Sequence, residues 1–191
     1  IDQRIACQAL MTESIDVIVN VVDATNLERH LYLTMQLLEL GIPVVVALNM
    51  TDRLEAVGKQ VDCDRLAQCL GCPVVPIIAT QKQGLEQLKK VVTTQSVFNT
   101  SYSPVKFPAC IEKTVDAIIA EQPAVLSNQK SLSRWMILGL LAEDQPCLLD
   151  LPLSLKKTIK HHRQQVLFEL DEDIDIMIAD ARYGFIEQCV K

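Results

Sequence analysis

The stretch that decides the fold is Ile42-Pro43-Val44-Val45-Val46-Ala47-Leu48-Asn49-Met50-Thr51-Asp52. Residues 42–48 form an apolar run rich in valine, which favours a strand buried on both faces. Such strands belong to parallel sheets that helices cover on each side. The polar residues Asn49 to Asp52 would follow the carboxyl end of this strand, which is where open α/β sheets bind ligands.

The segments around this strand alternate in the same way. Thr25-Asn26-Leu27-Glu28 has the form of a capping box and predicts a helix that runs to Leu40 and ends at Gly41. Asp62 or Asp64 can cap a short helix that ends at Gly71. The remaining predicted elements are strands over 15–22 and 74–78 and a helix from about residue 85. Strands that alternate with helices predict an α/β fold with a parallel sheet and right-handed crossovers.

The second half of the chain is predicted to be all helical. A polar stretch from Asn99 to Pro104 marks the boundary. Beyond it the β-branched runs disappear, and the pattern predicts helices over 108–121, 131–143, 153–170 and 173–190. We therefore expect two domains, residues 1–99 and residues 105–191.

The polar residues after the central strand fit the pattern Asn-x-x-Asp, with which many GTPases recognise guanine. The Asp52 carboxylate can accept hydrogen bonds from guanine N1–H and from its 2-amino group, whereas adenine lacks that amino group and has an acceptor at N1. Met50 stands where the motif usually has lysine, and its thioether can contact a base by dispersion. Because Asn and Asp are also common in turns, a purely structural turn remains the alternative.

Composition and charge narrow the classes of partner. The net charge of −6 disfavours nonspecific binding to nucleic acid and to anionic lipid, and no basic stripe is present. The apolar runs are far shorter than the roughly 20 residues of a membrane helix, so we expect a soluble chain. The start Ile1-Asp2-Gln3-Arg4 has no initiating methionine and no signal-peptide pattern, which predicts a fragment of a longer polypeptide.

The cysteines and histidines do not predict a metal site. The odd number of cysteines, spread through apolar contexts, predicts reduced thiols in a cytosolic protein. Cys69 and Cys72 have the spacing of a redox or zinc pair, but they close a helix, where the dipole disfavours a thiolate, so a structural role is predicted. His161 and His162 point to different faces of a helix and are interpreted as solvated. The seven cysteines are Cys7, Cys63, Cys69, Cys72, Cys110, Cys147 and Cys189.

Three segments carry a resemblance to a known family: Val21-Val22-Asp23-Ala24-Thr25-Asn26-Leu27-Glu28-Arg29-His30-Leu31-Tyr32-Leu33-Thr34, residues 44–50, and Ile178-Ala179-Asp180-Ala181-Arg182-Tyr183-Gly184-Phe185-Ile186. Together they resemble the bacterial ferrous iron transport protein B family. The resemblance implies part of a Ras-like G domain followed by a helical domain. It also implies that the whole protein couples GTP binding or hydrolysis to Fe²⁺ uptake at the cytoplasmic face of the bacterial inner membrane. The implied partner is the transmembrane Fe²⁺ channel portion of the same polypeptide. Association into a homo-oligomer is a further alternative.

The resemblance also implies which residues bind GTP or GDP. Asn49, Met50 and Asp52 match the guanine-specificity motif, and Ala79 and Thr80 match the loop whose backbone N–H contacts guanine O6. Residues 26–29 are interpreted as structural, and Arg182 with Tyr183 as a pair that locks the last helix onto the G domain.

The phosphate-binding motif Gly-x-x-x-x-Gly-Lys-Ser/Thr is absent from the sequence, since Gly58-Lys59 is followed by Gln60. In the family, the P-loop, the switch regions and the Mg²⁺ site precede the part that this chain resembles. No catalytic residue is therefore predicted, and the chain by itself is not expected to hydrolyse GTP. One alternative is an α/β interaction module that has lost nucleotide binding and anchors protein partners. Another is a ribosome-assembly GTPase, although the basic surface that such a protein needs is missing.

Overall fold

The computed structural model describes residues 9–10, 14–95, 105–122, 130–143 and 151–191. Its contacts group the chain into a sheet unit, Ile15–Pro104 with Tyr183–Lys191, and a helical unit, Ile1–Ser14 with Val105–Arg182. The predicted fold class, a parallel α/β sheet followed by a helical part, is confirmed. The division into domains 1–99 and 105–191 stays a prediction.

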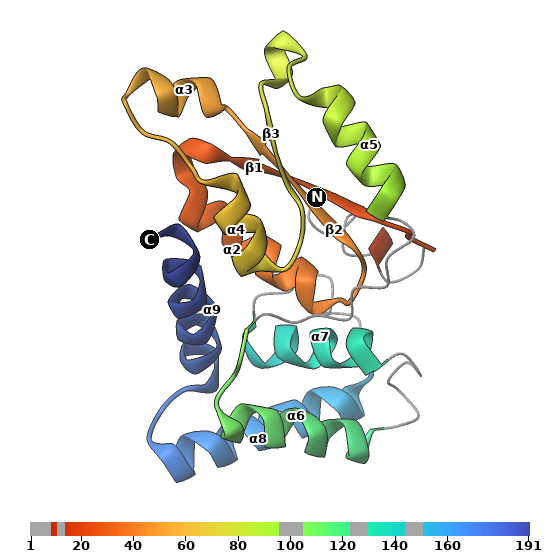
Figure 1. Cartoon of the computed structure of the whole chain (residues 1–191). Helices are drawn as coiled ribbons and strands as arrows, with labels where there is room; N and C mark the ends of the chain where they lie inside the picture. The colour runs from red at the N-terminus through yellow and green to blue at the C-terminus, as the bar shows by residue number, and fades with distance from the viewer. Residues whose placement is uncertain (1–8, 11–13, 96–104, 123–129, 144–150) are drawn as a thin grey trace. The chain divides into compact units, whose positions relative to one another are not determined.

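The sheet unit is built on three parallel strands in the order β1-β2-β3 (Figure 1). The strands are β1 (Ile18–Asp23), β2 (Val44–Asn49) and β3 (Val74–Ile77). Asp23 pairs with Asn49, and Asn49 pairs with Ile77, so the three strands end together. The loops that follow them therefore leave the sheet along one edge.

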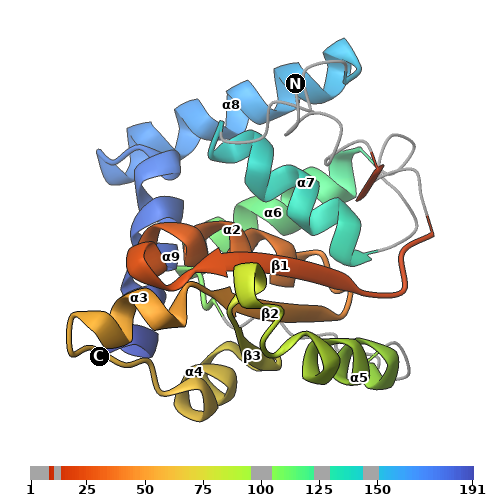
Figure 2. The same ribbon diagram turned by 90° about the horizontal axis from the view of Figure 1, so that it is seen from above.

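Helices follow each strand, as the alternation predicted (Figure 2). They are the 3-10 helix η1 (Ala24–Asn26), α2 (Leu27–Glu39), α3 (Thr51–Ala56), α4 (Cys63–Leu70), the 3-10 helix η2 (Ala79–Gln81) and α5 (Leu85–Gln95). Helix α3 was not predicted, because residues 49–52 were interpreted only as a loop motif.

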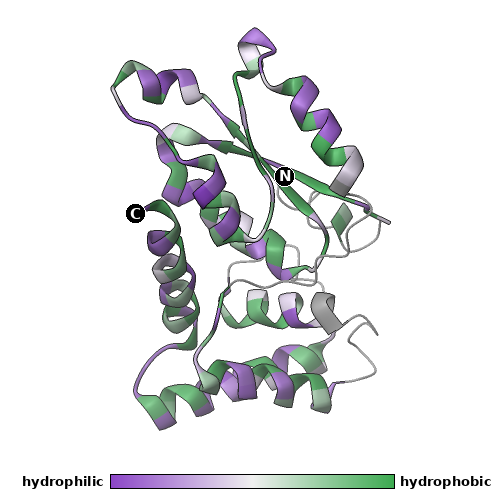
Figure 3. Cartoon of the chain, viewed as in Figure 1, coloured by the Kyte–Doolittle hydropathy of each residue, from purple (hydrophilic) through white to green (hydrophobic). Residues whose placement is uncertain are grey.

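Helices α2 and α5 cover opposite faces of the sheet. Val45 and Ala47 belong to a buried cluster against which residues of α5 pack. Asn20 pairs in register with Val46, whose side chain points the other way, and the Asn20 amide donates to the Thr34 hydroxyl of α2 at 2.8 Å. The central strand β2 is thus enclosed, and Figure 3 shows its hydrophobic character.

The start of α2 differs from the prediction. Thr25 does not cap α2. It lies inside η1, where its N–H and its hydroxyl donate to Asp23 Oδ1 at 2.8 and 2.7 Å. Asp23 therefore holds the turn, and the predicted capping box is wrong. The end of this helix at Gly41 agrees with the prediction, because Gly41 adopts a left-handed φ of 74°.

The short helix α4 has the predicted ends. The Asp62 carboxylate accepts from the Arg65 N–H at 2.9 Å, which identifies Asp62 as the cap. Gly71 follows the helix in the left-handed conformation, with φ 69°.

The helical unit contains the predicted helices, each within two residues of its predicted ends. They are α6 (Ala109–Glu121), α7 (Lys130–Leu141), α8 (Leu153–Leu170) and α9 (Ile174–Val190), of which the residues from Tyr183 group with the sheet unit. The Arg134 guanidinium of α7 donates two hydrogen bonds to the Glu112 carboxylate of α6, at 2.6 and 2.8 Å. Such a bidentate pair fixes the two helices against each other.

One histidine prediction is wrong. His161 is exposed, as predicted, but His162 is buried and its Nε2 lies 3.0 Å from Glu121 Oε1 of α6. Neighbouring residues on a helix point about 100° apart, so α8 directs one of the two rings at α6. Which ring meets α6 depends on how the helices pack.

The cysteine prediction also needs correction. Cys69 of α4 and Cys189 of α9 form a disulfide, whereas reduced thiols were predicted. The two residues are 120 positions apart, and only the folded chain brings them together. Among the described residues, the free cysteines are Cys63, Cys72 and Cys110.

The predicted pair Arg182-Tyr183 divides between the two units. The Tyr183 ring lies 5.1 Å from the Tyr32 ring of α2, so Tyr183 does pack on the sheet unit. The buried Arg182 belongs to the helical unit, where its guanidinium lies 6.0 Å from the centre of the Phe107 ring. The locking role of the pair stays a prediction.

Candidate nucleotide-binding site

The loop after β2 carries Asn49, Met50 and Asp52, all half-buried. Asn49 ends the strand, and Met50 adopts a left-handed conformation with φ 64°, which turns the chain directly into α3. The Arg53 N–H donates to the Met50 carbonyl at 3.1 Å and closes the first turn of that helix. Asp52 lies in this first turn, so the loop places the three predicted residues within one tight bend.

The loop after β3 carries Ala79 and Thr80, both exposed. The Ile78 N–H donates to the Gln83 carbonyl at 3.1 Å, and the Gln83 N–H donates back at 3.2 Å. Lys82, with φ 57°, makes the turn between them. This small closed loop holds the backbone N–H groups of Ala79 and Thr80 in fixed positions.

A hydrogen bond joins the two loops. The Ala79 N–H donates to Asn49 Oδ1 at 3.1 Å, across thirty positions of the sequence. The structure therefore brings Asn49 and Ala79 together. The carboxamide nitrogen of Asn49, the Asp52 carboxylate and the backbone of the second loop supply a donor and acceptor set of the kind that reads a planar base edge.

Gly84 is a residue of this site that the sequence analysis missed. It has φ 79°, and a Cβ at this position would lie 2.3 Å from the Pro76 carbonyl oxygen. Only glycine fits between the loop and β3. The available signal was a glycine immediately before the helix predicted to begin near Leu85.

Asp23, at the end of β1 beside Asn49, is a second residue whose local role the sequence did not indicate. Its carboxylate accepts from the hydroxyl and the N–H of Thr25, and from the Asn26 amide at 3.3 Å. These hydrogen bonds, led by that from the Thr25 hydroxyl, lower the pKa of Asp23. The carboxylate therefore stays ionised and fixes the turn next to the candidate site.

Two cavities of the sheet unit border the site without containing it. One, of about 500 Å³, is lined by Thr51 of α3 and by Ile78 and Gly84 of the second loop. The other, of about 430 Å³, is lined by the turn at residues 24–29 and by Leu54 of α3. None of the five predicted binding residues lines either of these two cavities.

No three or more His, Cys, Asp and Glu side chains within the described ranges are grouped in a way that could hold a metal ion. No helix in those ranges has the length and apolar character needed to cross a membrane.

The chain matches two family descriptions in succession. Residues 1–92 match "Ferrous iron transport protein B", and residues 107–191 match "FeoB cytosolic helical domain". It is 35% identical over 193 residues to the Fe(2+) transporter FeoB of Escherichia coli (strain K12), and 35% identical to that of Salmonella typhimurium. All of this chain aligns in both comparisons, but it spans only 23% of each relative's length.

Solved structures agree with the sequence relatives. A mutant of NFeoB from S. thermophilus bound to GMPPNP has a TM-score of 0.84 and 32% identity, covering 98% of this chain and 73% of that one. NFeoB from S. thermophilus bound to GDP.AlF4- and K+ has a TM-score of 0.81 and 33% identity, with coverage of 98% and 73%. A likeness at this identity and coverage, on top of the two successive matches, means that the chain belongs to the FeoB family of ferrous iron transport proteins.

Proposed function

We propose that this chain is the base-recognising part of the GTP-binding region of a ferrous iron transporter, together with the adjoining helical domain. In this proposal it is the C-terminal part of the G domain, and Asn49, Met50, Asp52, Ala79 and Thr80 bind the guanine of GTP or GDP. The observation that carries the proposal is the bond between Asn49 Oδ1 and the Ala79 N–H, because it ties the two candidate loops into one unit at the carboxyl edge of a parallel sheet.

The chemistry of these residues suits guanine. The Asp52 carboxylate would accept from N1–H and from the 2-amino group together, and Met50 would lie along the base. The O6 oxygen needs a donor from the second loop. Since the Ala79 N–H already donates to Asn49, that donor would be shared between Asn49 and O6, or the neighbouring Thr80 N–H would supply it.

The phosphates and Mg²⁺ would be held by a P-loop and switch regions elsewhere in the transporter. Two findings support this division. Strand β1 has no described partner on its outer side, and its Val19 and Val21 are 40% and 58% exposed. The nucleotide-bound S. thermophilus chains also extend beyond the part that this chain covers.

In the whole transporter, nucleotide binding or hydrolysis would be coupled to Fe²⁺ uptake through the transmembrane portion of the same polypeptide. The described residues would lie at the cytoplasmic face of the bacterial inner membrane. The relatives named as Fe(2+) transporters support this assignment. The same proposal includes a homo-oligomer. The molar mass of the chain in solution tests this.

Calorimetry with GDP tests the assignment of a nucleotide site. We expect weak or undetectable heat with this chain and saturable binding once the preceding P-loop segment of the transporter is joined to it. If the extended protein also fails to bind GDP, the chain is an interaction module that has lost nucleotide binding.

The reading of the base is tested by Asp52→Asn in the extended protein. An amide at this position can donate to the 2-carbonyl of xanthine, so GTP affinity should fall and that for xanthosine triphosphate should rise. Loss of the charge-assisted pair should cost about 2 to 4 kcal/mol, on the order of 30-fold to 1,000-fold in affinity. The measurement is competitive titration with both nucleotides.

Asp64→Asn is the matched control, because Asp64 is an aspartate in the first turn of α4 and is exposed. It should leave both affinities unchanged. If the Asp52 variant still binds guanine nucleotides more tightly than xanthine nucleotides, as the unmodified protein does, residues 49–52 are only a turn.

A further inference from the structure

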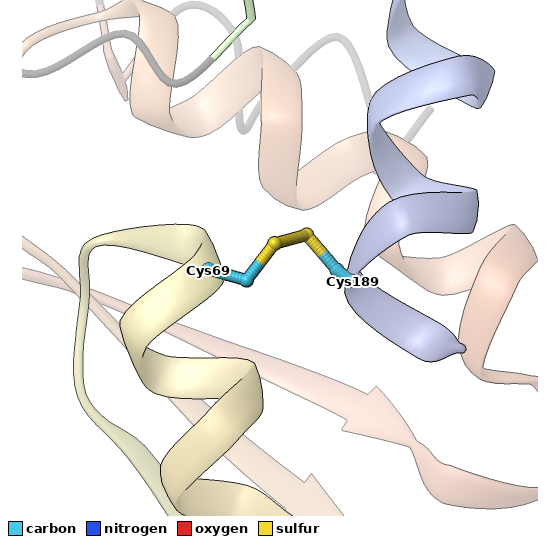
Figure 4. Close-up of a disulfide and its surroundings, with 2 residues drawn as sticks. All are labelled: Cys69 and Cys189. Atoms are coloured by element: carbon cyan, nitrogen blue, oxygen red, sulfur yellow. A yellow bond between two sulfur atoms is a disulfide. The ribbon is translucent and has the colours of Figure 1, made fainter.

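The disulfide between Cys69 and Cys189 fastens the end of the last helix to the sheet unit (Figure 4). Cys69 lies in the last turn of α4 and Cys189 in the last turn of α9. Their Cα atoms are 5.6 Å apart, a separation that suits a disulfide without movement of the backbone. The two helices are therefore preorganised for this bond.

The end of α9 is placed against elements that adjoin the candidate site. The Tyr183 ring packs on Tyr32 of α2, and Ile186 is buried. Val190 lines the cavity of about 430 Å³ that Leu54 of α3 also lines. The bond at Cys189 thus holds in place a helix end that lines a cavity beside α3, the helix whose first turn contains Asp52.

The burial of the cysteines indicates which of them takes part first in thiol–disulfide exchange. Cys69 is half-buried, whereas Cys189 is only 5% exposed. Cys72, three positions from Cys69, is buried, and burial raises the pKa of its thiol to about 12. Burial therefore disfavours Cys72 as an attacking thiolate, and among the described residues Cys189 is the partner that the fold places against Cys69.

We propose that Cys69 and Cys189 form a reversible redox clasp that holds the end of α9 against α4 when oxidised and releases it when reduced. Disulfides in cytosolic proteins are usually transient or redox-sensing, so the proposed placement at the cytoplasmic face favours a reversible bond over a permanent structural one. The inference rests on that placement, but it does not depend on nucleotide binding.

The oxidant is a low-molecular-weight disulfide. The Cys69 thiolate attacks one of its sulfurs, forms a mixed disulfide and expels one small thiol. The Cys189 thiolate then attacks the Cys69 sulfur, forms the protein disulfide and expels the second small thiol. The protein loses two electrons and two protons, and the small disulfide gains both, so that two thiols leave. A dithiol in excess runs the same steps in reverse.

Thiol trapping in the intact 191-residue chain tests the clasp. The protein is equilibrated in glutathione buffers of graded oxidised-to-reduced ratio, quenched with acid and alkylated. It is then digested, and the peptides are identified by mass spectrometry. We expect the Cys69–Cys189 linked peptide to appear and disappear reversibly along the series. Absence of this peptide at every ratio, or its persistence at every ratio and in excess dithiothreitol, would overturn the proposal.

Hydrogen exchange in the two redox states tests the release. Reduction should remove protection from the amides of residues 183–190 and leave those of α6 unchanged. Cys189→Ser should behave like the reduced protein under oxidising conditions, and Cys110→Ser, in α6, like the oxidised wild type. Because the wild type is compared with itself, the result does not depend on the folding of a variant. Equal protection of residues 183–190 in both states would show that the bond holds nothing in place.

Discussion

Asp23 shows how one side chain organises the edge of the sheet where the loops emerge. It ends β1, accepts three hydrogen bonds from the two residues Thr25 and Asn26, and lies in register with Asn49. Within the segment of residues 23–29, Asp23 therefore has a structural role. The residues after Asp23 are held by its carboxylate and do not themselves cap α2.

Asp23→Ala should destabilise the chain by about 1 kcal/mol, because it removes the acceptor of the turn. The pKa of Asp23 is lower in the folded chain than the unfolded value of about 3.9, so the stabilisation is present above that pH and is lost as the pH falls through the folded pKa. Urea unfolding from pH 7 down to pH 3 should show wild type and variant converging below about pH 4.

The exposed Asp16 provides the control, since Asp16→Ala removes the same group ahead of β1. It should change the free energy of unfolding little. A difference between wild type and Asp23→Ala that stays constant down to pH 3 would mean that the carboxylate is not what stabilises the turn.

Among the elements, the loop between β3 and α5 is tightly constrained by backbone geometry. Its two hydrogen bonds between Ile78 and Gln83 close it, and Gly84 lets the chain pass the Pro76 carbonyl. The exposed Ala79 and Thr80 can therefore vary in side chain while their N–H groups stay in place.

Gly84→Ala and Gly58→Ala form a matched pair at this scale. Both glycines are left-handed, with φ 79° and 71°, so both variants should lose on the order of 1–2 kcal/mol. Only at Gly84 does the new methyl group meet an atom, the Pro76 oxygen at 2.3 Å, whereas nothing lies within 4 Å at Gly58. We expect a further loss of about 1–3 kcal/mol for Gly84→Ala, measured as the difference in urea unfolding. Equal losses would show that the loop moves aside freely.

At the scale of the whole molecule, the chain combines a sheet unit that carries the candidate site with a helical unit that has its own core. Ile111, Val115 and Ile118 of α6 and Ile137 and Leu138 of α7 are fully buried. The bidentate pair between Glu112 and Arg134 adds a fixed contact between these helices.

A fragment of residues 105–191 should therefore keep its helical circular dichroism signal and unfold cooperatively. A fragment of residues 105–182 should be equally stable, because the residues from Tyr183 onward group with the sheet unit. The measurement is thermal unfolding followed at 222 nm. Loss of the helical signal in both fragments would mean that the chain has one inseparable core.

The sequence by itself determined the parallel α/β order, the ends of α6 to α9, the cap at Asp62 and the motif at Asn49 to Asp52. These features depend on hydrophobic period and on capping and turn residues, which act within a few positions of the chain. The bond from Ala79 to Asn49, the pairing of Cys69 with Cys189 and the burial of His162 were decided by the tertiary structure. Each of these joins residues 30 to 120 positions apart, and local periodicity carries no information about which distant side chain will face another once the helices and strands have packed.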